Sequence, residues 1–183
     1  MYDRRPSLWV EPLEDWGQGA IQLFELPTND EIHDNIVAAW VPAEPAKAGS
    51  SYRFRYRLHW LADEPYPTTM ARCVATRLGN GGQPGLPRPR GVRKFMVEFL
   101  GGPLVNLPFG VKPEVVLWAS RGSFSYVFSE AVPDGVPGHW RAQFDLTVDG
   151  QQPVEMRLFL RSGGKDLTET WLYQYHPVPP AQS

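Results

Sequence analysis

Apolar and polar residues alternate along much of the chain, which is the pattern of β-strands with one buried and one exposed face. The clearest case is Tyr52 to Trp60, where aromatic and aliphatic side chains alternate with Arg and His. The same alternation recurs over 140–148, 154–160 and 171–175. Further strands are predicted at about 71–78, 92–99, 114–120 and 123–129, because turn signals such as Asp149-Gly150 separate these runs.

This succession of strands predicts an all-β protein. About seven or eight short antiparallel strands with one apolar face fit an immunoglobulin-like β-sandwich over residues 51–178, followed by a tail at 179–183. The usual cysteine pair is absent because the chain has one cysteine, so only the architecture is predicted. No segment has a convincing helical period. Asp30 to Trp40 is the nearest candidate, and its second half fits a strand equally well.

A small, polar, proline-bearing segment at 42–50 predicts a linker. Residues 1–41 precede it and contain two predicted strands, Leu8–Glu11 and Ala20–Leu26, with a candidate third at Asn35–Val41. Three strands do not bury a stable core by themselves. We therefore interpret residues 1–41 as the end of a larger β-sandwich domain.

Composition narrows the classes of partner. The 18 basic and 20 acidic residues give a net charge of −2, which provides no long-range attraction to nucleic acid or anionic lipid. The arginines at 53, 55 and 57 are interpreted as an exposed sheet face with acidic neighbours rather than a nucleic-acid interface. No apolar run is long enough to span a bilayer, and no hydrophobic signal region follows the first residues.

Metal and cofactor chemistry is not expected. The four histidines are scattered without metal-ligand spacing, and the lone Cys73 lies in an apolar strand pattern typical of a small core residue. No phosphate-binding glycine-rich loop and no serine nucleophile motif occur.

An acidic cluster around Glu31 and Asp34 is flanked by Trp16 and Trp40. Carboxylates hydrogen-bond sugar hydroxyls, and aromatic rings stack on the apolar faces of pyranoses. Glycoside hydrolysis needs two carboxyl groups on opposite sides of the scissile bond, and Glu31 and Asp34 are candidates for one side. A solvated acidic turn, with Asp30 or Asp34 capping a helical turn, is the simpler interpretation of the pattern alone.

Several ordered motifs point to a known family. They include Arg4-Arg5-Pro6-Ser7-Leu8-Trp9, Asp15-Trp16-Gly17, Glu31-x-x-Asp34-Asn35, Tyr56-Arg57-Leu58-x-Trp60 and Glu169-Thr170-Trp171-Leu172-Tyr173. In this order, and over nearly the whole chain, the sequence resembles the periplasmic glucan biosynthesis protein G/D family.

The resemblance implies an exported, periplasmic Gram-negative protein needed for osmoregulated periplasmic glucans, whose backbones are β-1,2-linked. It also implies a large N-terminal β-sandwich, a short linker and a C-terminal immunoglobulin-like domain. Family members resemble inverting β-1,2-glucan hydrolases. By the intact Glu-x-x-Asp-Asn spacing, Asp34 matches the general acid and Glu31 a neighbouring glutamate. Trp9 and Trp16, in matching motifs, are assigned with Glu31 to substrate binding.

The expected partners are β-1,2-glucan and the glycosyltransferase machinery that synthesises it. A full family member is more than twice as long as this chain, and its signal peptide and general base have no counterpart here. We therefore expect a fragment, a mis-called start or a degenerate copy that is inactive alone as a glucanase. The alternative is a non-catalytic β-sandwich module that binds carbohydrate or a protein partner.

Overall fold

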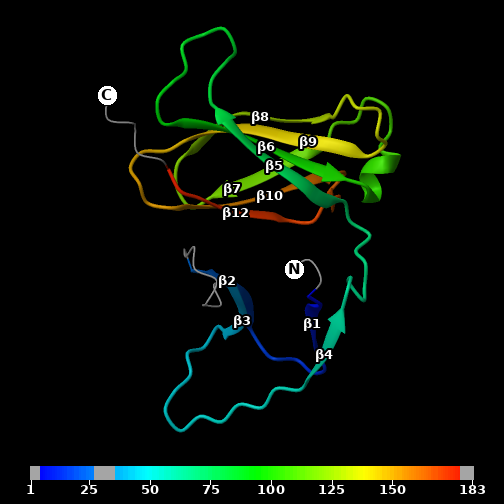
Figure 1. Cartoon of the computed structure of the whole chain (residues 1–183), viewed down its shortest axis with the longest axis vertical. Coiled ribbons are helices and arrows are strands. Elements are labelled where there is room, and N and C mark those ends of the chain that lie inside the picture. Colours follow the sequence, from blue (N-terminus) through cyan, green and yellow to red (C-terminus); the bar gives the residue numbers. More distant parts are fainter. Residues whose placement is uncertain (1–4, 27–35, 178–183) are drawn as a thin grey trace. The chain divides into compact units, whose positions relative to one another are not determined.

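The computed structural model describes residues 5–26 and 36–177, and the chain divides into two compact units, Met1–Pro67 and Thr68–Ser183 (Figure 1). The regular elements of the first unit are β1 (Ser7–Pro12), β2 (Gly19–Glu25), β3 (Ile36–Pro42) and β4 (Tyr56–Leu61). Those of the second are β5 (Arg72–Asn80), β6 (Val92–Leu100), the 3₁₀-helix η2 (Gly102–Asn106), β7 (Glu114–Ala119), β8 (Ser123–Ala131), β9 (His139–Thr147), β10 (Val154–Ser162), β11 (Lys165–Asp166) and β12 (Trp171–Tyr175).

The all-β prediction is confirmed, and every strand pair between these elements is antiparallel. The predicted strands match the observed ones to within a few residues. The candidate helix at 30–40 is a strand over its described part, which belongs to β3. Within the ranges that the structure describes, no helix is long and apolar enough to cross a membrane.

The first unit contains two antiparallel strand pairs. β1 pairs with β4, with Trp9 opposite His59, and β2 pairs with β3, with Ile21 opposite Trp40. The strand predicted from Tyr52 therefore belongs to this unit and starts only at Tyr56, and the linker predicted at 42–50 connects β3 to β4 inside it. The sequence pattern identifies β4 as a strand but carries no information about its partner, since alternation reports one face and not the neighbouring strand.

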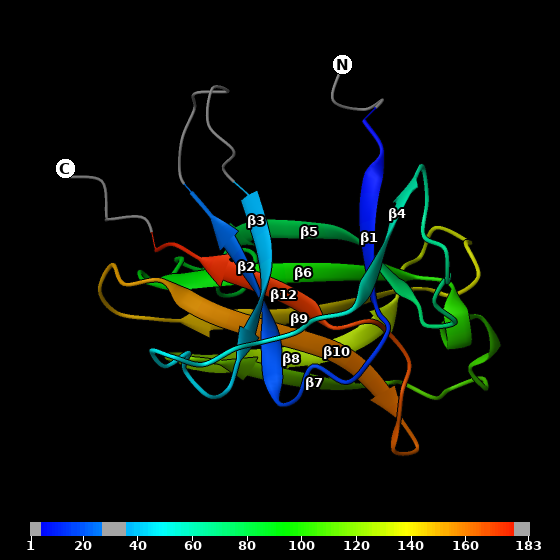
Figure 2. The same cartoon turned by 90° about the horizontal axis from the view of Figure 1, so that it is seen from below.

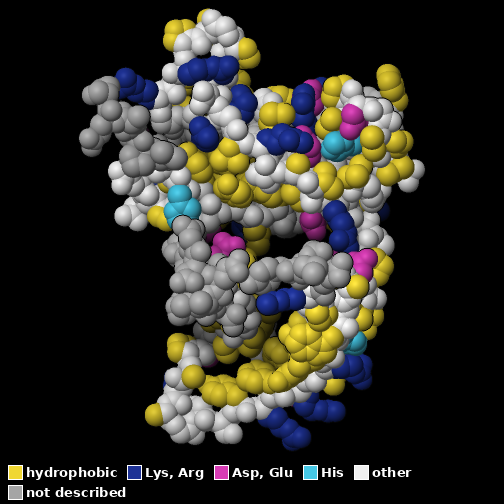
Figure 3. All heavy atoms as spheres, in the orientation of Figure 1, with side chains coloured by type: hydrophobic (Ala, Val, Ile, Leu, Met, Phe, Trp, Pro, Cys, Tyr) yellow, Lys and Arg dark blue, Asp and Glu magenta, His cyan; other side chains and the backbone are white. Residues whose placement is uncertain are grey.

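None of the described residues of the first unit is buried. The β2–β3 pair carries apolar side chains on both faces: Ile21 is 70% exposed on one face and Phe24 is 45% exposed on the other. Figure 3 shows hydrophobic side chains spread over the visible surface of this unit. A strand pair that is apolar on both faces is typical of the interior of a larger structure.

The second unit is built from two sheets that pack face to face (Figures 1 and 2). One sheet has the strand order β5-β6-β9-β8, and in the other β10 pairs with β7, β11 and β12. The apolar faces of the two sheets meet in one shared interior, as expected when each strand with alternating side chains buries one face. The two-layer arrangement follows directly from the period-two pattern of these strands.

Aromatic side chains from both sheets fill this interior. The Phe95 and Phe144 rings are stacked with centroids 5.1 Å apart, and the Trp171 ring meets both edge-on at 6.3 Å. The Trp171 indole N–H donates to Thr76 Oγ1 at 2.8 Å, so its polar atom is satisfied. The fully buried members of the core are Phe95, Val97, Phe99, Ala142, Phe144, Leu146, Val154, Leu158, Leu160 and Ala71.

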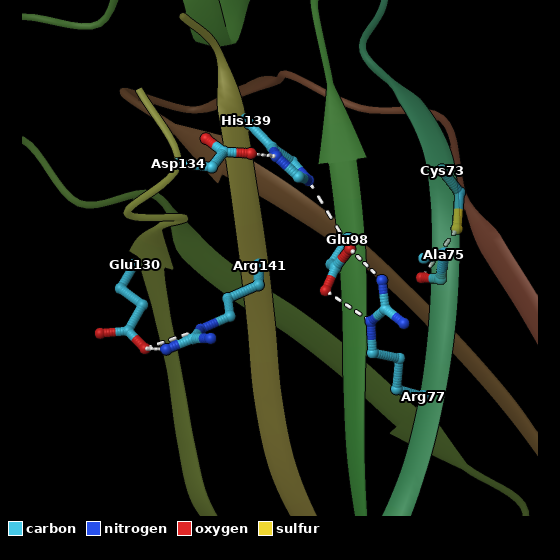
Figure 4. Close-up of polar contacts among 8 residues, drawn as sticks. All are labelled: Cys73, Ala75, Arg77, Glu98, Glu130, Asp134, His139 and Arg141. Carbon is cyan, nitrogen blue, oxygen red and sulfur yellow. Dashed lines mark hydrogen bonds and ion pairs between the residues drawn. The ribbon is translucent and has the colours of Figure 1, made fainter. Parts of the chain in front are cut away.

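Ion pairs cross the outer face of the β5-β6-β9-β8 sheet (Figure 4). Arg77 Nε donates to Glu98 Oε1 at 2.9 Å, and Arg141 pairs with Glu130 at 2.5 Å. His139 lies between two acids: its Nδ1 is 2.6 Å from Asp134 Oδ2, and its Nε2 is 3.6 Å from Glu98 Oε2. The pKa of the Glu98 carboxyl lies below its ordinary value, mainly because Arg77 donates a hydrogen bond to it. Burial acts in the opposite direction and raises this pKa.

We predict that amide exchange separates the two units. Amides in residues 5–26 and 36–67 should exchange orders of magnitude faster than those of β6, β9 and β10, because none of these described residues of the first unit is buried whereas β6, β9 and β10 line a closed core. Hydrogen–deuterium exchange at neutral pH, followed residue by residue, measures this. Similar protection in both units would contradict the prediction.

We predict that Arg77→Gln destabilises the second unit mainly above pH 5. A carboxyl group whose pKa is lower in the folded protein stabilises the fold at pH values above its ordinary pKa of 4.5. This stabilisation is lost as the pH falls through the pKa of the folded protein. Arg77→Gln removes the hydrogen bond that contributes most to the lowered pKa of Glu98, so the Tm of the variant should lie below that of the wild type at neutral pH. The two curves should converge toward about pH 3.

Thermal denaturation between about pH 3 and 8 tests this. Arg157→Gln is the control, because Arg157 lies over the Trp118 ring, 5.1 Å from its centroid, and no carboxylate pairs with it among the described residues. Its Tm curve should run parallel to that of the wild type. A constant offset for Arg77→Gln at every pH would show that Glu98 titration does not contribute.

Candidate functional site

The two acidic residues predicted to act on the substrate fall, in the sequence, between two described strands. β2 ends at Glu25 and β3 begins at Ile36, and these two residues are partners in the strand register. Asp34 and Glu31 belong to the connection between them and lie outside the described residues. Their predicted catalytic and substrate-binding roles therefore remain predictions.

Trp16 is the centre of an aromatic cluster. Its ring lies edge-on to Trp40 of β3 at 6.1 Å, to Phe54 at 5.2 Å and to Tyr56 of β4 at 6.1 Å. Trp16 thus connects the β2–β3 pair to β4, and the cluster is the main packing contact of the first unit. Aromatic edge-to-face pairs of this kind add about 0.5–1.5 kcal/mol each beyond the area they bury.

Local hydrogen bonds set the position of Trp16. The Asp15 carboxylate accepts from the backbone N–H of Gly17 at 2.8 Å, in a turn where Gly17 has a φ of +84°. The indole N–H of Trp16 donates to the carbonyl oxygen of Arg55 at 3.3 Å, and Leu13 N–H donates to the same oxygen at 3.0 Å. The Asp-Trp-Gly motif is therefore a turn that directs the Trp16 ring toward β3 and β4.

The Trp40 ring requires a glycine at position 19. A Cβ atom on Gly19 would lie 2.4 Å from the Trp40 ring, so any other residue would displace the ring. The Trp40 indole N–H is inaccessible and has no hydrogen-bond partner within the described residues. A buried donor without a partner is costly, so the cluster as it stands leaves one polar group unsatisfied.

A cavity of about 440 Å³ opens beside this cluster. It lies within the range of about 300–1,000 Å³ that small-ligand pockets occupy. Its wall is almost wholly apolar and is formed by Trp16, Trp40, Val41, Pro42, Glu44, Pro45, Ala46, Tyr52, Phe54 and Tyr56. The Tyr52 and Phe54 rings are nearly parallel, with an interplanar angle of 2°, and Tyr52 is 51% exposed. Flat, accessible aromatic faces with one carboxylate nearby can stack on a sugar ring.

Trp9 lines a second cavity. Its ring meets Tyr66 edge-on at 6.1 Å, and it lines a separate cavity of about 230 Å³ that also includes Asp63. Trp16 lines the first of these two cavities and Trp9 the second. The substrate-binding roles predicted for Trp9 and Trp16 therefore remain predictions.

A charged cluster lies across β1 and β4. Glu11 Oε2 is 2.9 Å from His59 Nε2 and 3.2 Å from Arg57 Nη1. The hydrogen bond with His59 is the largest cause that lowers the pKa of the Glu11 carboxyl, and Arg57 lowers it further. Arg57 thus has the acidic neighbour that the sheet-face interpretation of these arginines expected.

These electrostatics bear on the choice of a general acid, whose pKa must be raised toward neutrality. Among the described carboxyl groups, those with a perturbed pKa are Glu11, Glu98 and Asp134, and each is lowered. They are ionised at neutral pH and suit ion pairing rather than proton donation. No group of three or more His, Cys, Asp or Glu residues in the part of the chain that the structure describes could hold a metal ion.

Sequence reasoning missed the role of Tyr52 and Phe54. The alternation of Tyr52, Phe54 and Tyr56 was interpreted as the buried face of the sandwich strand, whereas these rings line the Trp16 cavity of the first unit. The available signal was the aromatic character of all three positions, which is unusual for an ordinary core strand but does not reveal which tryptophan they meet.

Comparison with known proteins places this geometry in a family. The family model described as "Periplasmic glucan biosynthesis protein, MdoG" matches residues 1–175. "Glucans biosynthesis protein D 2" of Ralstonia nicotianae is 81% identical over 176 residues, which cover 96% of this chain and 33% of that protein. "Glucans biosynthesis protein D" of Pseudomonas fluorescens is 47% identical over 187 residues, covering 98% of this chain and 34% of that protein.

A third relative, "Glucans biosynthesis protein D" of Xanthomonas axonopodis pv. citri, is 45% identical over 185 residues and is likewise covered over 34% of its length. The chain thus spans about a third of the length of the curated relatives it matches. Because the family model extends over almost the whole chain, the protein belongs to the MdoG family of periplasmic glucan biosynthesis proteins.

Proposed function

We propose that this chain supplies one side of a periplasmic glucan-processing site, with Asp34 as the general acid and Glu31 beside it. The family match over residues 1–175 carries this proposal, because it includes the intact Glu31-x-x-Asp34-Asn35 spacing. The substrate is a β-1,2-linked glucan, and the compartment is the periplasm for which the family is named.

The proposed reaction is inverting hydrolysis. Asp34 protonates the departing glycosidic oxygen, while a second carboxylate on the other face of the sugar activates water. The downward pKa shifts of Glu11 and Glu98 make both carboxyls poor proton donors. Neither of them is therefore a candidate for the general acid.

The second carboxylate is proposed to come from outside these 183 residues. Two observations support this. The chain spans about a third of its relatives, and the apolar faces of β2 and β3 stay exposed in the first unit, as expected if other strands normally cover them. The immunoglobulin-like assignment of the second unit likewise rests on the family resemblance, with its two antiparallel sheets in support.

A second candidate is a non-catalytic carbohydrate-binding module. The Trp16 cavity favours it, because aromatic rings and a nearby Glu44 provide the groups that bind sugars without any need for catalysis. The glucan-synthesising glycosyltransferase machinery is the protein partner in this case. Separate measurements of binding and turnover distinguish the two functions.

We predict that Asp34→Asn in a full-length relative, at the matching position, abolishes hydrolysis of linear β-1,2-glucan while glucan binding persists. Loss of a general acid costs about 10²–10⁴-fold in rate. The asparagine keeps the shape of the side chain, so binding measured by calorimetry should change little. Release of reducing ends measures hydrolysis.

The matched control is the acid-to-amide change at the position of Asp166, which pairs with Arg161 on the second unit and should leave activity unchanged. The 183-residue chain itself should release no oligosaccharides. Rapid hydrolysis by the Asn variant, or turnover by the isolated chain, would contradict the enzymatic proposal.

We predict that Tyr52→Ser weakens glucan binding by the isolated chain about 2- to 10-fold, the loss expected for one aromatic contact. Tyr52 is 51% exposed and its ring stacks on Phe54, whereas the ring contacts of Trp16 are with Trp40, Phe54 and Tyr56, so removal of Tyr52 disturbs the packing around Trp16 less than a change at Trp16 itself. Titration with β-1,2-gluco-oligosaccharides, followed by tryptophan fluorescence, measures the affinity.

Trp118→Ala is the control, because Trp118 is an exposed aromatic residue of the second unit, 47% exposed on β7. It should bind glucan as the wild type does. Equal affinities of the wild type and Tyr52→Ser would exclude the Trp16 cavity as a sugar site, and equal losses in both variants would point to nonspecific stacking.

A further inference from the structure

The Trp16 cavity combines many aromatic rings with a single charge. Glu44 is the one charged residue among the described residues that form its wall. The rings come from three separate segments of the first unit and belong to Trp16, Trp40, Tyr52, Phe54 and Tyr56. An almost wholly apolar wall offers few hydrogen-bond partners to a polar ligand. The wall therefore suits a ligand that needs aromatic contact and an opposite charge more than it needs hydrogen bonds.

Pairwise ring contacts join these side chains into one continuous wall. The centroid of the Trp16 ring lies 5.2 Å from that of Phe54. It lies 6.1 Å from the centroids of Trp40 and Tyr56. Tyr52 joins the wall through Phe54, with the two centroids 6.4 Å apart. Because an aromatic ring attracts a cation that lies within about 6 Å of its centroid, rings spaced this closely can act on one cation together.

The angles between the rings favour a cation as well. The plane of Trp16 is inclined by 66° to that of Phe54 and by 81° to that of Tyr56. Two rings that meet at a steep angle leave a corner in which a small group contacts the π-face of each. The ring quadrupole is negative on these faces. A cation in such a corner is therefore attracted by both rings, whereas a neutral group of the same size gains only dispersion and burial.

Glu44 provides a negative charge beside the rings. Its side chain is exposed, and no ion pair involves it in the part of the chain that the structure describes. The carboxylate is therefore available to a cation that enters the cavity. Because the pair would be accessible to water, it should add only modestly to the affinity.

The apolar wall also discriminates between kinds of cation. A primary ammonium group has three N–H donors, and it is destabilised when it leaves water without acceptors for them. A quaternary ammonium group has no N–H donor and presents methyl groups to its surroundings. Cages of aromatic rings recognise quaternary ammonium ligands by cation–π attraction. The composition and the ring geometry of the cavity fit this class of ligand.

We propose that the Trp16 cavity binds a quaternary ammonium group, with Trp16, Phe54 and Tyr52 around the cation and Glu44 as its counter-charge. The cavity volume of about 440 Å³ falls within the range of small-ligand pockets, so the molecule that carries the ammonium group can enter with it. The inference does not rest on the catalytic role proposed for Asp34, because binding of this cation needs no proton transfer.

Choline is the probe, because it carries a trimethylammonium group on a short neutral chain. Its neutral isostere, 3,3-dimethylbutan-1-ol, has carbon in place of the nitrogen, and ethanolamine has the charge without the methyl groups. Each is titrated into the ¹⁵N-labelled 183-residue chain, with the indole N–H signals of Trp16 and Trp40 as local reporters. Choline should bind about 3- to 30-fold more tightly than the isostere, as expected for cation–π attraction. Ethanolamine should bind more weakly than choline.

Two variants separate the contribution of the charge from that of the rings. Glu44→Gln should weaken choline binding about 2- to 5-fold and leave binding of the isostere unchanged, because only the cation interacts with the carboxylate. Tyr52→Leu keeps apolar bulk but removes a ring, so the affinities for choline and the isostere should become more similar. Glu114→Gln is the control, because it removes an exposed carboxylate from β7 of the second unit and should bind choline as the wild type does.

Two sources can supply the quaternary ammonium group: a soluble small molecule or the headgroup of phosphatidylcholine. Sedimentation of the chain with vesicles of phosphatidylcholine, and with vesicles of phosphatidylglycerol, distinguishes them. Sedimentation with phosphatidylcholine alone, reduced in Glu44→Gln, would support the lipid source. Choline binding without sedimentation would support the soluble source.

Near-UV circular dichroism of each variant reports whether the aromatic cluster keeps its packing. The proposal is overturned if choline and its isostere bind equally, if neither binds, or if Glu44→Gln and Glu114→Gln weaken choline binding equally. Binding of β-1,2-gluco-oligosaccharides without binding of choline would also overturn it, and would leave the carbohydrate-binding candidate intact. Choline binding without oligosaccharide binding would support the proposal and exclude that candidate for this cavity.

Discussion

An apolar sheet face must be covered by another apolar surface, and the two units of this chain differ in whether that requirement is met. In the second unit, the stacked Phe95 and Phe144 rings of one sheet meet Trp171 of the other, and a closed core results. In the first unit, no described side chain is buried, and β2–β3 exposes apolar residues on both faces. The second unit can therefore stand as a folded scaffold, whereas the first is organised chiefly by the aromatic contacts of Trp16.

This difference matters for function because the motif proposed to be catalytic, Glu31-x-x-Asp34-Asn35, belongs to the first unit. General-acid catalysis requires a carboxyl group held near the sugar in a site that keeps it protonated. The carboxyls of Glu11, Glu98 and Asp134 are instead held ionised by their partners, as Glu11 is by His59 and Arg57. A catalytic site around Asp34 would need the environment that additional chain provides, in keeping with relatives about three times as long.

Buried and half-buried charges in the second unit have structural tasks. Glu98 joins β5 to β6 through Arg77, and Asp145 ties the β5–β6 loop to the sheet through Gly82 and Lys94. The β5–β6 loop is consequently held to the sheet at its neck.

The sequence by itself determined the all-β class and located the strands closely, because alternation with period two is a local consequence of one covered face. Its ordered motifs also identified the family. The sequence did not determine which strands pair, because pairing depends on contacts between segments about 40 residues apart. Only the structure shows that Tyr56 to Leu61 pairs with β1 and that the Phe54 ring packs against Trp16. Tertiary structure also buried Asp145 beneath the β5–β6 loop, since burial of a side chain is decided by what the rest of the chain places over it.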